Sequence, residues 1–352
     1  LNLPPVPITD LAIRQGSLVA ATQGRGFWVL DDLFMVQAAA DGIGSTPVQV
    51  FAPESTVKMP NRGWRSEDFE GSNPASGVRI YYHLENGLEP GEDEPLSIEI
   101  FDAAGERVRR FSSEESDYER CKLINSDPRR PYKPTYPPAS QGLNHWNWKG
   151  DRDGFSCVEN TTLFGGLQGP PAPPGGYTAR VTANGRSAEV AFELLADPRR
   201  TATPEQTKEW QARLDETSAL LERLLVGLGH LRETERQIAA LMDNHPYDDD
   251  LQKAGNAALQ AIETWDHQVI QPLHQTLEDE DAWETMLAGQ VQFLMAVIAR
   301  TGAPVTQGAL DRLADLAGQC EALEREKVRI QSDLVAPINN WARENDIPHV
   351  SM

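Results

Sequence analysis

Apolar and polar residues alternate with a period of two along several short segments in the first half of the chain. In YTARVTA (177–183) the four apolar residues occupy alternate positions and therefore share one face of a strand. Comparable segments are VRIYYHL, LSIEIFD, ERVRRFS, LNHWNW and SAEVAFELL, and DAAG (102–105) and ANGR (183–186) are typical of hairpin turns. This pattern predicts an antiparallel β-sandwich of about 100 residues, interrupted by long excursions at 112–140 and 150–175.

Two further strand-like segments lie near the start of the chain. SLVAAT and FWVL flank a Gly-Arg-Gly turn within Thr22–Leu33 and predict two short antiparallel strands. Two strands alone are marginally stable in water, so we expect them to belong to a larger sheet. A connector, AAADGIGSTPVQVF, follows them up to about residue 50.

The second half changes to a spacing of three and four residues, which is typical of amphipathic helices. Thr203, Pro204 and Gln206 supply an N-cap, a proline in the first turn and a capping-box partner for the first helix, which DNHPYDDD ends. Its apolar stripe consists of Leu214, Leu221, Leu224, Leu228, Leu231, Ile238 and Met242.

Three more helices are predicted after the first. They cover about 249–278, with a kink at Pro272, about 281–300, and a last segment that begins near Thr306. The last carries one stripe, formed by Leu313, Leu316, Cys320, Leu323, Ile330, Leu334, Ile338 and Trp341. Four stripes joined by short breaks favour an antiparallel, up-down helical bundle, with Cys320 as a small core residue.

The distribution of proline supports this division, because proline is excluded from helix interiors. Nineteen of the 25 prolines lie at or before Pro198. The sequence thus predicts a mixed fold, all-β and then all-α, with domains at 1–50 (opening strands and connector), 51–198 (β-sandwich with long loops) and 199–352 (about four helices).

The chain is strongly acidic, with 53 Asp and Glu against 32 Lys and Arg, a net charge of −21 over 352 residues. Such a surface disfavours binding to nucleic acid and to anionic lipid; solubility and adaptation to a saline habitat both account for it. No apolar run is long enough to span a membrane, and no signal peptide is visible. Because the chain begins with Leu1, we expect a processed or truncated piece of a larger protein.

The three cysteines show no spacing typical of zinc sites. Cys121 and Cys157 both lie in the β-rich part, so a disulfide between them in an oxidising compartment and two unpaired buried thiols are alternatives.

The opening VPITDLAIRQGSLVAATQGRGFWVLDDL (6–33) resembles the closing blade of large bacterial β-propellers of the sortilin-like (Vps10-type) and BNR-repeat, sialidase-like families, many of which are described as glycosyl hydrolases. The blade motif is Gly24, Arg25, Gly26, Phe27 and Trp28, and Gln23 stands where the family usually has His. GLNHWNWKGD (142–151), GPPAPPGGYTARVTANG (169–185), Asp197-Pro198-Arg199 and APVTQGALDRLADLAGQ (303–319) follow in the family's order. The resemblance implies an immunoglobulin-like sandwich, an exported protein and propeller repeats upstream that carry any catalytic site.

Few residues of the chain itself suggest chemistry. The common nucleophile, phosphate-binding, zinc-protease and dinucleotide motifs are missing from the sequence. His267 and His274, seven apart on a predicted helix, read best as surface histidines. Asp151, Asp153 and Glu159 offer oxygens for Ca²⁺, although the spacing is not that of a calcium loop; a charged turn is the alternative, and no other cofactor is expected.

Aromatic residues raise the question of carbohydrate binding. Trp146 and Trp148 share a strand face, which is typical of a sandwich core but also of a platform for a sugar ring. Tyr132 and Tyr136 lie in RRPYKPTYPPAS, a predicted extended loop.

These observations favour a non-catalytic accessory region that completes a propeller and mediates domain packing or partner docking. Its expected partners are upstream propeller domains, in the same or a cleaved chain, with a glycan or protein ligand and homo-oligomerisation through the helices as further options. The alternatives are a carbohydrate-binding module of a glycoside hydrolase, and a region that contributes loops, such as the acidic Glu67, Asp68 and Glu70, to a hydrolase active site.

Overall fold

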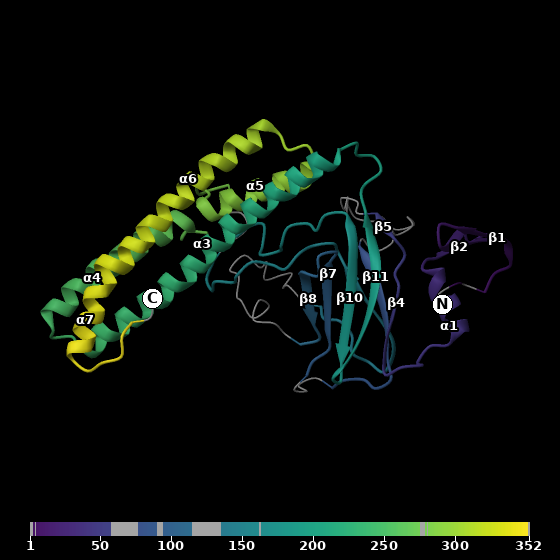
Figure 1. The fold of residues 1–352 in the computed structure, drawn as a ribbon, viewed down its shortest axis with the longest axis horizontal. Helices are drawn as coiled ribbons and strands as arrows, with labels where there is room; N and C mark the ends of the chain where they lie inside the picture. Colours follow the sequence, from purple (N-terminus) through teal and green to yellow (C-terminus); the bar gives the residue numbers. More distant parts are fainter. Residues whose placement is uncertain are drawn as a thin grey trace. The chain divides into compact units, whose positions relative to one another are not determined.

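The computed structural model describes residues 3, 5–57, 77–89, 94–114, 135–161, 163–274, 279 and 281–350. The fold is mixed, with β-sheets in the first half and helices mostly in the C-terminal half (Figure 1). The chain forms two compact units. The first comprises Leu1–Glu115, Thr135–Arg152 and Ala172–Arg200, and the second comprises Ser116–Pro134, Asp153–Pro171 and Thr201–Met352.

The first sheet of the chain is an antiparallel meander of three strands. It contains β1 (Ile8–Arg14), β2 (Ser17–Thr22) and β3 (Phe27–Leu30) in the order β1-β2-β3. The two strands expected from the sequence are β2 and β3, and their antiparallel pairing is confirmed. β1 joins them through a two-residue turn, Gln15-Gly16, in which both residues have positive φ.

Part of the expected connector after β3 is helical. α1 (Leu33–Asp41) occupies its beginning, and β4 (Val48–Phe51) occupies its end. The N-cap residue of α1, Asp32, is of a type that commonly caps helices, but it adopts a left-handed conformation and makes no side-chain capping bond. Its carboxylate binds Arg79 and Tyr81 of β6 instead.

Two larger sheets in the first unit share one hydrophobic core. One has the order β4-β6-β9, with β6 (Val78–Leu84) and β9 (Gly142–Trp148). The other has the order β5-β11-β10-β7-β8, formed by β5 (Thr56–Val57), β7 (Ser97–Asp102), β8 (Arg107–Ser112), β10 (Gly175–Ala183) and β11 (Arg186–Leu195). Fully buried residues of both, such as Ile80, Tyr82, Ile98 and Val181, belong to a single cluster.

Both hairpin turns expected in this region are confirmed. The Asp102 carboxylate accepts hydrogen bonds from the amides of Ala104 (2.9 Å) and Glu106 (3.0 Å), which closes the β7–β8 turn. Asn184 and Gly185 both adopt positive φ between β10 and β11, as a two-residue hairpin requires.

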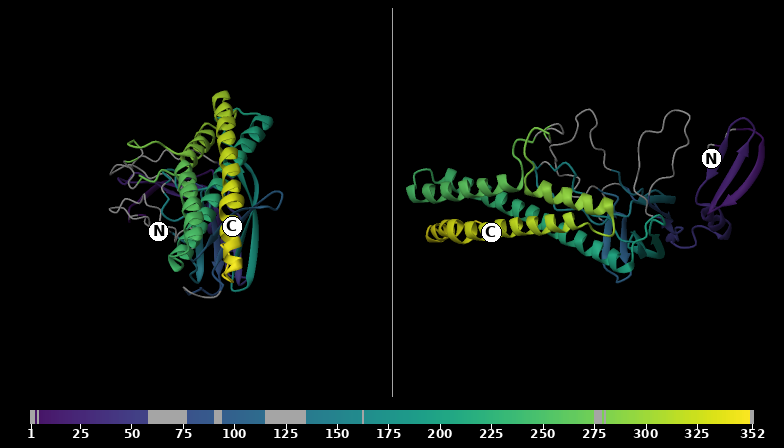
Figure 2. Two further views of the ribbon diagram at one scale, coloured as in Figure 1. Left: turned by 90° about the vertical axis from the view of Figure 1, so that its left-hand side faces the viewer. Right: turned by 90° about the horizontal axis from the view of Figure 1, so that it is seen from above.

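The second unit contains α3 (Pro204–Asn244), α4 (Asp249–Val269), α5 (Leu287–Thr301), α6 (Gln307–Arg329), a π-helical segment η2 (Ile330–Val335) and α7 (Ala336–Glu344). Both views of Figure 2 show the long helices running side by side. The Thr203–Gln206 capping box and the buried stripe of α3 are confirmed. The indoles of Trp210 and Trp265 donate to the carbonyls of Ile298 (2.9 Å) and Leu323 (2.8 Å) and tie neighbouring helices together.

Three helix predictions need correction. α4 ends at Val269, so Pro272 lies beyond the helix instead of kinking it; proline lacks an amide hydrogen and disfavours helical geometry in the residue before it. α5 begins at Leu287, six residues later than expected. The last helix runs from Gln307 to Glu344 but is not α-helical throughout, because the backbone is π-helical over Ile330–Val335 and Pro337 then lies in the first turn of α7.

The excursion after β9 also differs from its predicted place. Residues 153–171, which the sequence analysis included in the β-rich domain, belong to the second unit. Phe155, Val158, Leu163 and Leu167 are buried in the hydrophobic core of the helices. The chain therefore leaves the first unit after β9 and returns to it before β10.

Candidate functional site

The first sheet is apolar on both faces. Residues that pair directly across antiparallel strands lie on the same face, so the pairing assigns each side chain to one face. One face carries Leu11, Ile13, Leu18, Ala20, Trp28 and Leu30, and the other carries Ala12, Val19, Ala21, Phe27 and Val29, with Asp10, Arg14 and Ser17 as its polar residues. A sheet that covers a core on one side only would alternate apolar and polar residues.

The apolar side chains on both faces reach solvent. The exposed fractions of Leu11, Ile13, Phe27 and Val29 are 59%, 70%, 79% and 57%, and every residue of β1 is exposed. Scattered exposed apolar residues are ordinary, but this small sheet exposes two large apolar side chains on each face, Leu11 and Ile13 on one and Phe27 and Val29 on the other. Exposed apolar surface of this kind marks interaction sites. This surface is our candidate functional site.

The blade motif forms the turn that presents Phe27. Gly24 and Gly26 have φ of 81° and 70°, and the amide and hydroxyl of Thr22 both donate to the Gly26 carbonyl, at 3.1 and 2.7 Å. The indole of Trp28 donates to the carbonyl of Arg25 at 3.1 Å. The glycines are needed for the left-handed backbone, and these bonds give the motif a defined shape without burying Phe27.

Of the two aspartates after β3, Asp32 anchors the first sheet to β6, and Asp31 binds within the first sheet. The Asp32 carboxylate accepts hydrogen bonds from the Arg79 guanidinium and from the Tyr81 hydroxyl (2.9 Å), both on β6. Asp31 accepts from the Ser17 hydroxyl at 3.2 Å, and the amide of Leu33 donates to the carbonyl of Gly16 at 2.9 Å. The rings of Phe34 and Tyr81 make an edge contact at 5.8 Å.

The charges and hydrogen bonds of Asp32, Arg79 and Tyr81 favour a fixed attachment of the first sheet to β6. Burial raises the pKa of Tyr81, and its hydrogen bond to Asp32 raises it further against the opposing effect of Arg79. The hydroxyl is therefore protonated at neutral pH and donates to the Asp32 carboxylate. These groups are occupied by one another, so the arrangement suits attachment of two sheets better than acid–base catalysis.

The tryptophan pair does not form a sugar platform. Trp148 is completely buried, its indole donates to the Asp151 carbonyl at 2.8 Å, and its ring packs against Tyr177 and Phe192. Trp146 is half-buried and makes an edge contact with Phe111 at 5.4 Å. Both side chains face the shared core of the two larger sheets, which leaves no flat exposed pair of rings.

The remaining predicted site residues lie in different units or outside the part of the chain that the structure describes. Tyr136 is half-buried, while Tyr132 lies outside the described residues, as do Glu67, Asp68 and Glu70. Asp151 forms an ion pair with Arg109 at 3.7 Å in the first unit, whereas Asp153 and Glu159 belong to the second. Among the described residues no group of three or more His, Cys, Asp or Glu side chains could hold a metal ion.

The cysteines and histidines suggest structural roles. Cys157 is disulfide-bonded and Cys121 lies outside the described residues, so the pairing of these two stays a prediction. Cys320 is a buried free thiol, and burial raises its pKa to about 11, which fits its place in the core. His274 is buried beyond the end of α4 and does not share a helix face with His267.

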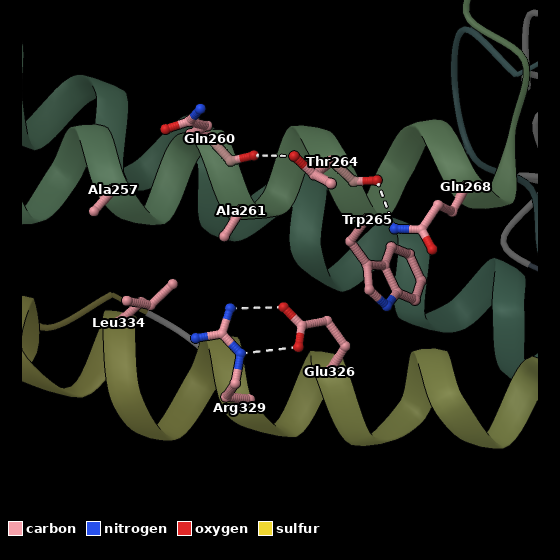
Figure 3. A pocket seen from close by; sticks show the side chains of 9 residues that line it. All are labelled: Ala257, Gln260, Ala261, Thr264, Trp265, Gln268, Glu326, Arg329 and Leu334. Carbon is pink, nitrogen blue, oxygen red and sulfur yellow. Dashed lines mark hydrogen bonds and ion pairs between the residues drawn. The ribbon is translucent and has the colours of Figure 1, made fainter.

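A groove of about 560 Å³ runs between α4 and the α6–η2 segment (Figure 3). Its only charged lining residues, Glu326 and Arg329, bind each other through two hydrogen bonds of 2.8 and 2.6 Å. The side-chain hydrogen bond from Arg329 lowers the pKa of Glu326, so this carboxylate stays ionised and paired. The lining therefore offers no group suited to proton transfer.

None of the described helices is long and apolar enough to cross a membrane. Comparison of the chain with protein-family models, curated proteins and solved structures gave no match. The residues of the first sheet are therefore the ones that suggest a function. The motif of its turn is readable from the sequence, whereas β1 was not predicted, although the Gln15-Gly16 pair is a turn signal.

Proposed function

We propose that this chain is a non-catalytic accessory region of a large, exported β-propeller protein. In this function the first sheet completes a blade, and the two larger sheets and the helical unit attach further domains or partners to the propeller. The resemblance of 6–33 to a closing blade suggested the idea, and the exposed apolar residues on both faces of the first sheet are the observation that carries it.

In a propeller, neighbouring blades cover both faces of each blade, because the blades are small antiparallel sheets arranged around a central channel. A blade is accordingly apolar on both sides, as the first sheet is. With Leu11, Ile13, Phe27 and Val29 all more than half exposed, the sheet has the composition of a buried element and the exposure of a surface one.

The rest of the chain fits an accessory role. In this proposal the two larger sheets form an immunoglobulin-like sandwich around their common core, and the helices form an antiparallel bundle that serves as a docking or oligomerisation element. The Asp32–Arg79–Tyr81 network would transmit the position of the blade to the sandwich, because it links the residue after β3 to the middle strand of the sheet β4-β6-β9. The burial of Trp148 removes the main support for a carbohydrate-binding module.

Site-specific photo-crosslinking tests the proposal. Phe27 is replaced by p-benzoylphenylalanine in the protein produced in its native host, and crosslinked peptides are identified by mass spectrometry after denaturation and digestion. The matched control carries the same residue at Tyr247, which is 96% exposed on the second unit.

We expect Phe27, but not Tyr247, to crosslink to peptides with the short alternating strands of a propeller. These peptides would come from the same polypeptide or from a cleaved partner, which the intact denatured mass distinguishes. Crosslinking at Phe27 no greater than at Tyr247, in protein whose intact mass is that of this chain alone, would overturn the proposal.

A further inference from the structure

β1 is an edge strand with an open outer side. It lies at the end of the order β1-β2-β3, is seven residues long and is exposed along its whole length. Proteins usually protect such edges with lysine, proline, bulges or a covering segment, because an edge exposes unpaired backbone groups to any passing strand. β1 has an irregularity between Ile8 and Asp10, but the stretch Leu11–Arg14 contains no lysine or proline and pairs with β2 in an unbroken register.

The turn between β1 and β2 determines which backbone groups point outward. Arg14 and Ser17 flank the two-residue turn and form the hydrogen-bonded pair that closes it. Hydrogen-bonded and non-hydrogen-bonded pairs then alternate, so the backbone N–H and C=O groups of Ile13 and Leu11 point away from β2. In agreement, the amide of Leu11 donates to the side chain of the adjacent Asp10 at 2.9 Å.

The opposite edge of the first sheet is less open. β3 has only four residues and runs directly into the Asp31–Asp32 anchor and α1. The indole of Trp28 is also bonded within its own turn. Of the two edges, β1 therefore offers the longer row of backbone groups, seven residues against four.

The side chains of β1 indicate what a partner strand would carry. Leu11 and Ile13 lie on one face, whereas Asp10, Ala12 and Arg14 lie on the other. Cross-strand neighbours of opposite charge stabilise a sheet, and like charges destabilise it. A complementary strand therefore has apolar residues opposite Leu11 and Ile13, a basic residue opposite Asp10 and an acidic residue opposite Arg14.

We propose that β1 accepts a fourth, antiparallel strand from the propeller, with this apolar and charged pattern. The inference rests on the proposed function, because it specifies how the blade is completed: by strand addition at the β1 edge, in which main-chain hydrogen bonds supply affinity and alternate side chains supply specificity. A four-stranded sheet is also the usual size of a propeller blade.

A synthetic peptide tests the edge on the isolated full chain. The probe contains Glu-Val-Thr-Val-Lys within a nine-residue peptide, so that in antiparallel pairing Glu meets Arg14 and Lys meets Asp10. Amide chemical shifts of Leu11 and Ile13 report binding, and a peptide with Glu and Lys exchanged is the control. We expect the exchanged peptide to bind at least threefold more weakly, and the double variant Asp10→Arg, Arg14→Asp to reverse this preference.

A proline variant separates the two sides of β1. Ile13→Pro removes an outward-pointing amide and leaves the ladder to β2 intact, so we expect it to abolish peptide binding while the β2 amides keep their shifts. Ala12→Pro, which removes an inward-pointing amide, is the comparison and should disturb β2. The charge-exchange experiment stands independently of whether either proline variant folds.

Several results would overturn the proposal. These are equal binding of the two peptides, absence of saturable binding, shifts centred on β3, binding unchanged in Ile13→Pro, or a self-associated chain in which the Leu11 and Ile13 amides are already protected. Specific peptide binding without propeller crosslinks at Phe27 would leave β1 as a strand acceptor and reject only the propeller function, so the two failures are distinguishable.

Discussion

Asp197 illustrates how a single side chain organises the segment between β11 and α3. Its buried carboxylate accepts hydrogen bonds from the amide, Nε and Nη2 of Arg199, at 3.0, 2.8 and 2.6 Å. The guanidinium hydrogen bonds and the amide hydrogen bond hold the pKa of Asp197 at about 2. Three donors from one residue fix a tight turn of the kind that Asp favours.

This carboxylate gives a pH-dependent prediction. A pKa lower in the folded than in the unfolded chain contributes stability that is fully present above the unfolded value, near 3.8, and is lost as pH falls through the folded value, near 2. We expect Asp197→Asn to lower the urea midpoint of unfolding at pH 7, and the difference from wild type to shrink between pH 4 and pH 2. A difference that is the same at pH 7 and pH 2.5 would contradict the assignment.

At the residue scale, the sequence pattern predicts spacing but leaves open which way a face points. Alternation correctly placed Trp146 and Trp148 on one face, but whether that face met solvent depended on the partners of β9. The pairing of Trp148 with Val78 on β6 and its packing against Tyr177 decide the matter, and both contacts are distant in sequence. No local pattern carries that information.

Among the elements, helices with explicit end signals were predicted best. The start of α3 was correct because Thr203, Pro204 and Gln206 form a capping box that is readable from the sequence. The end of α4 was wrong because the periodic pattern extends past Val269, while Pro272 acts on the backbone before it. α1, which starts without a side-chain cap, was missed.

Two helical glycines give a matched test of helix packing. A Cβ atom at Gly255 of α4 would lie 2.2 Å from Met242 Sδ and 2.9 Å from its Cγ, whereas a Cβ at Gly318 of α6 would meet nothing within 4 Å. We expect Gly318→Ala to stabilise the protein by about 0.5–1 kcal/mol through helix propensity. Gly255→Ala should destabilise it by about 1–3 kcal/mol, because the buried Met242 must move.

Chemical denaturation followed by the circular dichroism of the helices measures both changes. The two substitutions are chemically identical and differ only in the space around the new methyl group. An equal gain of stability in both variants would show that α4 is not packed closely against the end of α3.

At the scale of the whole molecule, the chain passes between the two units more than once instead of completing one before the other. Residues 153–171 leave the β-rich unit and supply part of the helical core. Helix side chains hold this loop: Glu222 accepts from the amide and hydroxyl of Ser156 at 2.9 and 2.5 Å, and Arg232 donates to the Glu159 carbonyl at 2.8 Å. Its buried apolar residues are irregularly spaced, so periodicity gave no indication of their partners.

The loop also explains why the predicted boundary at residues 198 and 199 is incomplete. Gln292 of α5 accepts a hydrogen bond from the amide of Gly165 at 3.0 Å and donates to the carbonyl of Gly166. A Cβ at Gly165 would lie 2.6 Å from Gln292 Cδ, so the glycine permits this close approach. The helices and the loop therefore form one hydrophobic core, although β10 and β11 lie between them in sequence.

A pair of core substitutions tests this division of the chain. Leu163 is buried among the helices although it lies between two strands of the first unit, and Leu96 is buried in the core of the two larger sheets. Truncation of a buried leucine to alanine costs about 2–5 kcal/mol, through lost burial and the cavity left behind. We expect Leu163→Ala to lower hydrogen-exchange protection in α3 and α5 and to spare β10, and Leu96→Ala to do the reverse.

Leu163→Ala and Leu96→Ala remove the same atoms and differ only in the core that loses contacts. If the loop only covers the helices without contributing to their core, Leu163→Ala will leave α3 protection unchanged. If the loop were part of the β-rich unit, β10 would lose protection instead. The expected pattern, with α3 weakened by a residue that precedes β10 in the chain, requires that the helical core be completed by a segment inserted between β9 and β10.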